Sequence, residues 1–393
     1  MPVEFDVIRV GLAGAGEFAA FLAEAFASLP HFELCAVASR TPSKRVRAIQ
    51  TYAAHKGRSP ASVRVREYAE AAHLAADPEV DAVILATPPD THASLGALML
   101  QQGKHLFLEK PGSLTADGLK NQLRIARQRG LALTVDLVMR HSPLVEAVKQ
   151  ILAKRLFGRP EQCIMRNAAH RVASGHWFWD EARSGGIFIE HGVHFFEVAR
   201  YWFGEGEAAS GHAAREPNGE ASRVWGTVMH IAPDGWTVPV TYYHGFTRLK
   251  QEPEFTRWEI LCTHGRIVMD GWIPQRLSLE GTVCATKTDE LLKFLAAIPT
   301  NPAPDTISRV RAQALNLSAS AGSAGDRVSF AHKLELPDRH GWYKALVQAR
   351  FADFYQMIQN PQHEGLITVE DAIRDLELAE TCSDRPLGVA FTR

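Results

Sequence analysis

The first 136 residues alternate short apolar runs with segments of helical length. The apolar runs are nearly continuous, as expected of strands buried on both faces; they cover residues 7–12, 34–38, 82–86, 105–108 and 131–135. The segments between them, residues 17–28, 43–55, 91–102 and 115–129, are long enough to form helices. Strands that alternate with helices build a parallel sheet covered by helices on both faces. The sequence therefore predicts an α/β domain of the doubly wound Rossmann type over residues 1–138.

The pattern changes near residue 140, where strand-like stretches begin to dominate. These stretches are residues 162–167, 225–230, 237–243, 258–262 and 266–269. They predict a second domain of α+β type over residues 139–393, built on a large, mainly antiparallel open sheet. Residues 298–326 are rich in Pro, Ala, Ser, Asn and Gly, which predicts an irregular insertion. Two amphipathic helices, residues 341–359 and 368–381, are expected to close the chain, with Thr368 and Asp371 as an N-terminal capping pair.

The composition excludes several classes of protein. A length of 393 residues suggests two domains, and a net charge of −1 gives no general attraction for nucleic acid or for an anionic membrane. The first residues lack the basic-then-apolar pattern of a signal peptide, and no apolar stretch is long enough to span a bilayer. The five cysteines contain no CxxC pair, which argues against a zinc ribbon or a disulfide framework. We expect a cytoplasmic protein without a nucleic-acid or membrane partner.

A glycine-rich segment, GAGEFA at residues 14–19, follows the first predicted strand and opens the first predicted helix. It matches the dinucleotide-binding pattern G-x-G-x-x-G/A. Gly14 permits a tight turn, Gly16 lets the backbone approach a pyrophosphate, and Ala19 allows close packing of helix on strand. The phosphates would meet free amides at the helix N-terminus, where the helix dipole favours negative charge. The residues expected to contact them are Gly14, Gly16, Glu17 and Phe18. The alternative is a tight turn that binds nothing.

The end of the second predicted strand bears on the choice of cofactor. An acid usually stands there to bind the adenosine ribose of NAD, but this chain has Ser39 and Arg40, with Lys44 one turn later. Without the acid a 2′-phosphate is not repelled, and these three residues could bind it. We therefore favour NADP slightly over NAD, since Arg40 could equally stack on adenine.

The segment TPPDTH at residues 87–92 follows the strand at residues 82–86. Doubly wound folds bind their ligands at the carboxyl ends of the strands. Thr87, Pro88 and His92 are therefore expected near the ribose of the cofactor, although the segment is as easily explained as a turn and helix cap.

The tripeptide EKP at residues 109–111 directly follows the apolar run at residues 105–108. Glu109 and Lys110 are thus expected at the carboxyl end of a buried strand, beside the cofactor. A lysine in this position can transfer protons, because desolvation and the positive charge of oxidised nicotinamide both lower the pKa of an amine. The alternative is an ordinary surface charge.

Together these signatures resemble the glucose–fructose oxidoreductase / inositol dehydrogenase / rhizopine catabolism (Gfo/Idh/MocA) family. The segment MRHSP at residues 139–143 is similar to the family's Arg-x-x-Pro segment, and GGIFIEHGVHFFE at residues 185–197 is similar to its Gly-Gly…Asp-x-Gly-x-His-x-x-Asp element. Both acids of that element are glutamates here, Glu190 and Glu197. The resemblance implies an oxidoreductase that uses NAD(P) to oxidise a secondary alcohol of a sugar, cyclitol or related polyol, or to reduce the ketone. It also implies a homodimer or homotetramer formed through the C-terminal sheet.

The resemblance assigns the catalytic roles. Lys110 would accept the hydroxyl proton during oxidation and donate it during reduction, while His194 would hydrogen-bond the reacting oxygen. Glu190 would orient His194 or bind a neighbouring hydroxyl, since residues 190, 194 and 197 share one face of an α-helix. Arg140, His176 and Trp177 are candidate substrate contacts, the last because aromatic faces suit the C–H surfaces of sugars.

A metal site is the alternative for the acids and histidines between residues 190 and 197. Neither H-E-x-x-H nor H-x-x-E-H is present, so we expect no metal. Two other functions use the same residues: a glycoside-cleaving enzyme that retains its cofactor through a transient oxidation, and a non-catalytic NAD(P)-sensing regulator. Glycoside cleavage without a net change in nicotinamide absorbance would favour the first, and cofactor binding without any turnover would favour the second.

Overall fold

The computed structural model describes residues 7–249, 251–302 and 326–384. It divides the chain into two compact units. Unit 1 contains Met1–Val138, Glu181–Gly185 and Val347–Glu377, and unit 2 contains Met139–Asp180, Gly186–Leu346 and Leu378–Arg393. The first long segment of unit 1 ends at residue 138, and two later segments, residues 181–185 and 347–377, group with it. One of them is held there by an ion pair between Arg183 and Asp90, at 3.3 Å.

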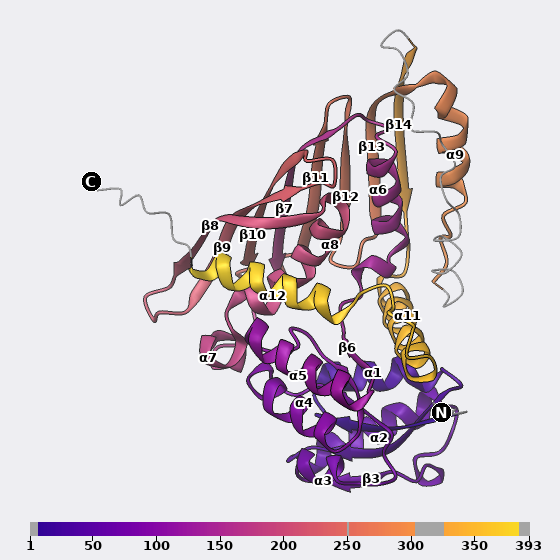
Figure 1. Ribbon diagram of the computed structural model, residues 1–393, viewed down its shortest axis with the longest axis vertical. Coiled ribbons are helices and arrows are strands. Elements are labelled where there is room, and N and C mark those ends of the chain that lie inside the picture. The colour runs from indigo at the N-terminus through magenta and orange to yellow at the C-terminus, as the bar shows by residue number, and fades with distance from the viewer. Residues whose placement is uncertain (1–6, 250, 303–325, 385–393) are drawn as a thin grey trace. The chain divides into compact units, whose positions relative to one another are not determined.

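Unit 1 is built on a six-stranded parallel sheet with the strand order β3-β2-β1-β4-β5-β6, with helices on both faces (Figure 1). Its strands are β1 (Ile8–Ala13), β2 (Phe32–Ala38), β3 (Arg66–Tyr68), β4 (Ala82–Leu85), β5 (His105–Leu108) and β6 (Leu133–Val135). The predicted doubly wound sheet is confirmed. Only β3 has no predicted counterpart, because its three residues are not apolar and lie at the edge of the sheet.

Four helices of unit 1 follow the predicted segments closely: α1 (Glu17–Ala27), α2 (Pro42–His55), α4 (His92–Gln101) and α5 (Ala116–Arg129). The short helices α3 (Ala71–Ala75) and α7 (Glu181–Ser184) have no predicted counterpart, and 3₁₀ turns lie at Pro60–Ser62 and Pro89–Thr91. Helix α5 shows why the sequence signals work: the Thr115 hydroxyl accepts a hydrogen bond from the Gly118 amide at 3.1 Å, and Gly130 ends the helix with φ 64°.

A helix from the far end of the chain completes the core of unit 1. Helix α11 (Arg339–Gln359) places Phe351 in a stack on Phe107 of β5, with ring centroids 4.3 Å apart. The rings of Phe26 and Phe32 lie 5.8 and 5.6 Å from that of Phe351. An aromatic cluster therefore joins α1, β2 and β5 to a segment more than two hundred residues later in the sequence.

Unit 2 is built on an eight-stranded sheet with the order β14-β13-β12-β11-β7-β10-β9-β8. Its strands are β7 (Pro160–Ala169), β8 (Glu205–Arg215), β9 (Ala221–Ile231), β10 (Thr237–Phe246), β11 (Phe255–Cys262), β12 (Gly265–Asp270), β13 (Arg276–Cys284) and β14 (Arg327–Glu335). Among the strands of the described residues in this sheet, only β7 and β10 pair in parallel, so the prediction of a mainly antiparallel sheet is confirmed. Strands β8, β13 and β14 have no predicted counterpart.

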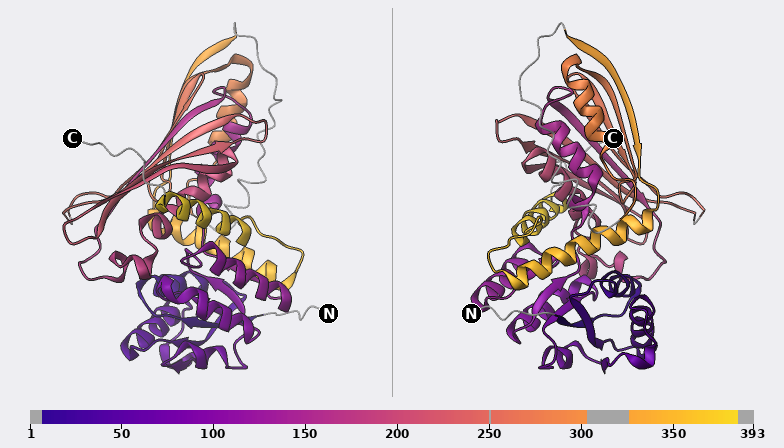
Figure 2. Two further views of the ribbon diagram at one scale, coloured as in Figure 1. Left: turned by 60° about the vertical axis from the view of Figure 1, so that its left-hand side comes forward. Right: turned by 90° about the vertical axis from the view of Figure 1, so that its right-hand side faces the viewer.

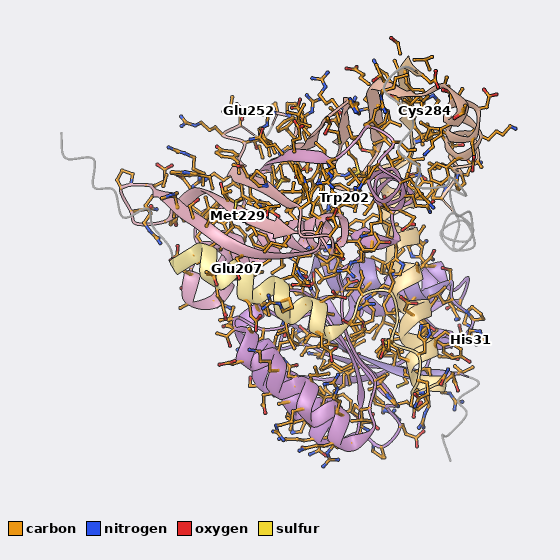
Figure 3. All side chains as sticks on the ribbon, turned by 45° about the horizontal axis from the view of Figure 1, so that its top comes forward. His31, Trp202, Glu207, Met229, Glu252 and Cys284 are labelled. Atoms are coloured by element: carbon orange, nitrogen blue, oxygen red, sulfur yellow. The ribbon has the colours of Figure 1, made fainter. Side chains whose placement is uncertain are left out.

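One face of this sheet is covered by helices, and the other face is open (Figure 2). Helix α8 (Val193–Phe203) packs Phe196 against Tyr242 of β10 at 4.8 Å and Trp202 against Trp258 of β11 at 5.0 Å. Helices α6 (Pro143–Ala153) and α9 (Thr288–Ala296) lie over the same face, and a 3₁₀ turn at Ala285–Lys287 precedes α9. Trp202 is buried here, whereas Met229 and Glu207 stand opposite each other on β9 and β8 (Figure 3).

The remaining sequence predictions concern the C-terminal third. Most of the predicted insertion, residues 303–325, lies outside the described residues. Helix α12 (Val369–Asp384) begins at the predicted cap: the Thr368 amide donates to Asp371 Oδ2 at 3.0 Å and the Asp371 amide donates to Thr368 Oγ1 at 3.1 Å. Within the described ranges, no helix is both long and apolar enough to cross a bilayer.

The aromatic cluster predicts that Phe351→Ala lowers the stability of unit 1. The substitution removes a fully buried ring and leaves a cavity between α1 and β5, which costs about 3–5 kcal/mol of unfolding free energy. Urea denaturation measures the loss. The exposed Gln356→Ala on the same helix is the control, and equal stability of the two variants would contradict the packing of α11 into this core.

Candidate functional site

The glycine-rich turn requires glycine at residue 14. Gly14 has φ +99°, in the region that side chains rarely adopt, and a Cβ added there would lie 2.2 Å from the carbonyl oxygen of Ala86. The Gly14 amide donates to the Ala38 carbonyl at 3.0 Å, which fixes the turn between β1 and the ends of two neighbouring strands. The turn is therefore pressed against the carboxyl edge of the sheet, and any side chain at residue 14 would displace it.

Gly16 is a glycine for a different reason. Its φ of −73° suits any residue, and a Cβ added there would meet no protein atom within 4 Å. It is the N-cap residue of α1, and no side chain of the described residues caps the first amides of that helix. The space in front of an uncapped helix N-terminus favours an anion. Gly14, Gly16, Glu17 and Phe18 thus fit the pyrophosphate of a dinucleotide, while buried Ala19 packs behind them.

The loop after β2 leaves two basic side chains on the surface. Arg40 and Lys44 are exposed, and Ser39 is half-buried. Arg45, which the sequence analysis missed, donates Nη1 to the Ser39 carbonyl at 2.6 Å and Nε to Glu67 at 2.8 Å. Arg45 therefore shapes the loop, and its partner Glu67 comes from β3, the strand that lacked an apolar signal.

The segment after β4 is held by its own polar side chains. The hydroxyls of Thr87 and Thr91 are 2.6 Å apart, and the Thr91 hydroxyl donates to the Pro88 carbonyl at 2.8 Å. His92 is fully buried and donates Nε2 to the Thr87 carbonyl at 2.7 Å. Burial lowers the pKa of His92 to about 4; the bond to Thr87 acts against this shift, and the nearby charge of Lys110 acts with it. His92 is thus neutral at pH 7 and supports Thr87 from inside the unit; its predicted contact with a cofactor stays a prediction.

Lys110 lies at the carboxyl end of β5, as predicted, and is half-buried. The amide of Glu109 donates to the Leu85 carbonyl at 2.9 Å, so the segment still follows the neighbouring strand β4. The charge of Lys110 acts to lower the pKa of two buried titratable groups of unit 1, His92 and Asp136. Lys110 is therefore not an isolated surface charge.

Asp136 is a site residue that the sequence analysis missed. It directly follows β6, and only 3% of its surface is exposed. Burial raises the pKa of Asp136 to about 7, although the positive charges of Arg350 and Lys110 act in the opposite direction. The available signal was an acid at the end of an apolar run, but its neighbour Lys110 belongs to a different strand.

The segment expected to carry residues 190, 194 and 197 on one α-helix is not a regular α-helix throughout. Residues Phe188–Gly192 form a π-helical turn, and α8 begins at Val193. A π turn inserts one residue per turn, so the expected α-helical spacing between Glu190 and His194 does not hold. Such turns often occur at functional sites. Both side chains are nevertheless buried, with 8% and 4% of their surfaces exposed.

Glu190 and His194 have different neighbours. Glu190 Oε2 lies 3.0 Å from Nε2 of His191. The ring of His194 lies edge-on to Trp272, with centroids 4.6 Å apart. Trp272 follows β12 and was not predicted, because nothing in its local sequence links it to a helix some eighty residues earlier.

Arg140 and Glu197 form a buried ion pair. Glu197 is fully buried, and the guanidinium of Arg140 also lies 5.0 Å from the centroid of the Tyr201 ring. A buried carboxylate needs a cation beside it, so the charge of Arg140 is already used within unit 2. The predicted contact of Arg140 with a substrate stays a prediction.

The aromatic segment before Glu181 divides into buried and accessible parts. Phe178 and Trp179 are buried and contact Phe246 at 5.5 and 5.0 Å. His176 is exposed, and its Nδ1 accepts a hydrogen bond from the Phe178 amide at 3.2 Å, which caps the 3₁₀ turn Trp177–Trp179. Trp177 is half-buried. His176 and Trp177 are thus the members of this segment that can meet a ligand.

The described side chains were also compared with the requirements of a metal site and of a disulfide. Across residues 7–249, 251–302 and 326–384, no group of three or more His, Cys, Asp or Glu side chains could hold a metal ion. All five cysteines lie in the described part of the chain, and each is a free thiol.

Comparison with known proteins identifies the family. Residues 8–137 match the model described as "Oxidoreductase family, NAD-binding Rossmann fold", and residues 145–268 match the "GFO/IDH/MocA C-terminal domain". The chain belongs to the Gfo/Idh/MocA family. The resemblance noted from the sequence is thereby confirmed for both halves of the chain.

Individual relatives are distant. A stretch of 198 residues is 30% identical to inositol 2-dehydrogenase from Rhizobium meliloti (strain 1021) and covers 50% of this chain and 56% of that one. The chain thus spans about half the length of the curated relatives it matches. The fold is similar to that of a 3-ketoreductase from Actinomadura kijaniata in complex with NADP and TDP-benzene (TM-score 0.71, 18% identity, covering 97% and 98% of the two chains). It is also similar to levoglucosan dehydrogenase with NADH and levoglucosan (TM-score 0.68, 17% identity, 96% and 97%).

A methyl group added at the two glycines of the turn should have different effects: one on stability and the other on cofactor binding. Gly14→Ala should lower the melting temperature, because the new Cβ overlaps the Ala86 carbonyl and the backbone has a positive φ. Gly16→Ala should leave the melting temperature unchanged and weaken dinucleotide binding about tenfold, ~1.4 kcal/mol, because the methyl fills the space before α1. Thermal melting and calorimetric titration with NADH and NADPH measure both. Unchanged affinity in Gly16→Ala would contradict phosphate binding at this turn.

Proposed function

We propose that the protein is an NAD(P)-dependent dehydrogenase/reductase that acts on a secondary alcohol, or the corresponding ketone, of a sugar, cyclitol or sugar-derived polyol. The observation that carries the proposal is the half-buried Lys110 at the carboxyl end of β5, in a dinucleotide-binding fold of the Gfo/Idh/MocA family. Named relatives act on this class of compound, among them inositol and levoglucosan dehydrogenases and a sugar-nucleotide 3-reductase.

The proposed cofactor site lies along the carboxyl edge of the parallel sheet. Gly14, Gly16, Glu17 and Phe18 would hold the pyrophosphate at the N-terminus of α1. Thr87, Pro88 and Glu109, with His92 behind Thr87, would line the ribose nearer the nicotinamide. When bound, the nicotinamide supplies the hydride acceptor or donor.

NADP is the favoured form of the cofactor. The loop after β2 carries exposed Arg40 and Lys44 beside half-buried Ser39, and it has no acid where NAD-specific folds usually place one. Two cations and a hydroxyl suit a 2′-phosphate, whereas an acid would repel it.

Proton transfer is assigned to the protein's own side chains. In oxidation, the Lys110 amine takes the proton of the alcohol hydroxyl, and in reduction the ammonium group returns it to the oxygen. His194 assists by a hydrogen bond to the same oxygen, and Glu190 orients the substrate through a neighbouring hydroxyl. His176, Trp177 and Arg140 are the proposed further contacts with the substrate.

We also propose that the open face of the unit 2 sheet forms a homo-oligomer. Side chains on this face alternate with those under α8, and several large apolar ones are exposed: Trp225, Ile231, Tyr243, Phe255 and Leu261. Trp225 and Tyr243 are directly opposite each other on β9 and β10. Ion pairs such as Arg166–Glu259, at 3.3 Å, lie between these apolar side chains. A face that combines exposed apolar side chains with ion pairs is suited to a protein interface.

The proposed function predicts that Lys110→Met abolishes turnover while cofactor binding survives. Loss of a proton-transfer group should lower kcat by about 10²- to 10⁴-fold. The assay is nicotinamide absorbance with purified protein, both cofactors and a panel of sugars, sugar acids and cyclitols. The exposed Lys120→Met of α5 is the control, and near-normal turnover of Lys110→Met would show that Lys110 does not transfer the proton.

The same assay separates the rival functions. Cleavage of a glycoside without net absorbance change would support the cofactor-retaining glycosidase. Tight cofactor binding with no turnover of any compound would support the sensing regulator.

The interface proposal predicts that Tyr243→Lys dissociates the oligomer. An added charge opposite Trp225 would have to be buried in the interface, which is unfavourable. Sedimentation equilibrium should show a fall in mass from a dimer or tetramer towards the monomer. Lys293→Glu, an exposed change on helix α9, is the control; an unchanged mass for Tyr243→Lys would place the interface elsewhere.

A further inference from the structure

Asp136 is a buried acid at the edge of the sheet that would hold the cofactor. Its amide donates to the Leu108 carbonyl at 2.8 Å, and Val135 pairs with Leu108 across β6 and β5. Asp136 is therefore level with Glu109, one residue before Lys110. Both the acid and the lysine leave the sheet at the ends of adjacent parallel strands.

The carboxylate of Asp136 is incompletely satisfied. Its Oδ1 is buried and has no hydrogen-bond partner among the described residues. Thr134 Oγ1, two residues earlier and hence on the same side of β6, is in the same condition. A buried acceptor without a donor costs free energy, so a group that arrives in the functional state is expected to satisfy it.

Two cations of unit 1 act on Asp136: Arg350 and Lys110. Arg350 belongs to α11 and directs Nε and Nη2 to the Val135 carbonyl, at 3.1 and 3.0 Å. Its Nη1 lies 3.9 Å from Asp353. Arg350 exerts the larger effect of the two, but a guanidinium keeps its proton at every accessible pH. Lys110 is therefore the cation whose protonation Asp136 can influence.

We propose that Asp136 is a positioning residue for Lys110: it holds the ammonium group and shares its proton, so that the pair sets the pH range of catalysis. The inference rests on the proposed function, in which Lys110 transfers the proton. In oxidation, the alcohol gives its hydroxyl proton to the Lys110 amine and its carbon-bound hydride to the oxidised cofactor, which leaves the ketone. The proton held by the pair then passes to solvent, and reduction runs through the same exchange in reverse.

The other charged groups near the pair do not replace this interaction. His92 is neutral, because burial lowers its pKa to about 4. Asp90 acts on His92 rather than on Asp136. Glu109 is half-buried beside Lys110, and Asp353 lies beyond Arg350. Asp136 itself titrates in the neutral range, since burial raises its pKa to about 7.

The test is the pH profile of Asp136→Asn, which removes the charge but keeps the shape. A carboxylate stabilises the ammonium form of a nearby lysine, so its loss should move both pH profiles down by about one unit. Oxidation needs the neutral amine and would rise at lower pH; reduction needs the ammonium and would begin to fall at lower pH. Thr134→Val, which changes an uncharged neighbour on the same side of β6, should leave both midpoints unchanged.

A second measurement needs no substrate. A carboxyl whose pKa is raised on folding binds more protons in the folded state, so its contribution to stability is lost as pH rises from about 4 to about 7. The melting temperature of Asp136→Asn relative to the wild type should therefore rise over this range. In Lys110→Met, removal of the cation should move the pH at which the melting temperature falls to a higher value than in the wild type. In the double variant, Lys110→Met with Asp136→Asn, this fall in melting temperature should be absent.

The outcomes separate this inference from the proposed function. Unmoved pH midpoints in Asp136→Asn, or a melting profile that Lys110→Met does not shift, would overturn the pairing of Asp136 with Lys110. Full turnover of Lys110→Met together with a shifted melting profile would instead refute the catalytic role of Lys110 and keep the electrostatic pair.

Discussion

The guanidinium of Arg350 on the Val135 carbonyl is the interaction on which unit 1 most depends. A fully buried cation costs free energy unless its donors are satisfied, and two of these donors bind the last residue of β6. The bond fixes α11 to the sheet in the register that also stacks Phe351 on Phe107. It therefore joins α11 to the residue directly before Asp136.

The chemistry of the proposed site follows from burial at that edge. Parallel strands end together, so the buried acid after β6 and the half-buried lysine after β5 leave the sheet at the same edge. Low polarity raises the pKa of the acid, and it lowers that of buried His92, which stays neutral and supports Thr87. The same edge presents the uncapped N-terminus of α1 beyond Gly16. The proposed phosphate binding and the proposed proton transfer thus both depend on where the strands end.

Local sequence patterns predicted most of the fold, because strand burial and helix capping depend on residues that are close together in the chain. Apolar runs of strand length identified five of the six strands of unit 1, and the Thr368–Asp371 cap located the start of α12. Strand β8 was not predicted because its buried positions are Gly206, Ala208 and Gly211, which give no apolar signal. Strands β13 and β14 do alternate apolar with polar residues, so their signal was present but was not used. The π turn at Phe188–Gly192 was not predicted, because its sequence also suits an α-helix.

The sequence by itself determined the family, the glycine-rich turn at Gly14 and Gly16, and the position of Lys110. Each of these depends on short motifs of consecutive residues. Only the tertiary structure decided which groups act on them. The charge of Lys110, which follows β5, acts on Asp136, which follows β6. Arg350 binds the Val135 carbonyl from a helix more than two hundred residues later. Trp272, just after β12, packs on His194. Electrostatics and packing depend on distance in space, and that distance is set by the folded chain rather than by position in the sequence.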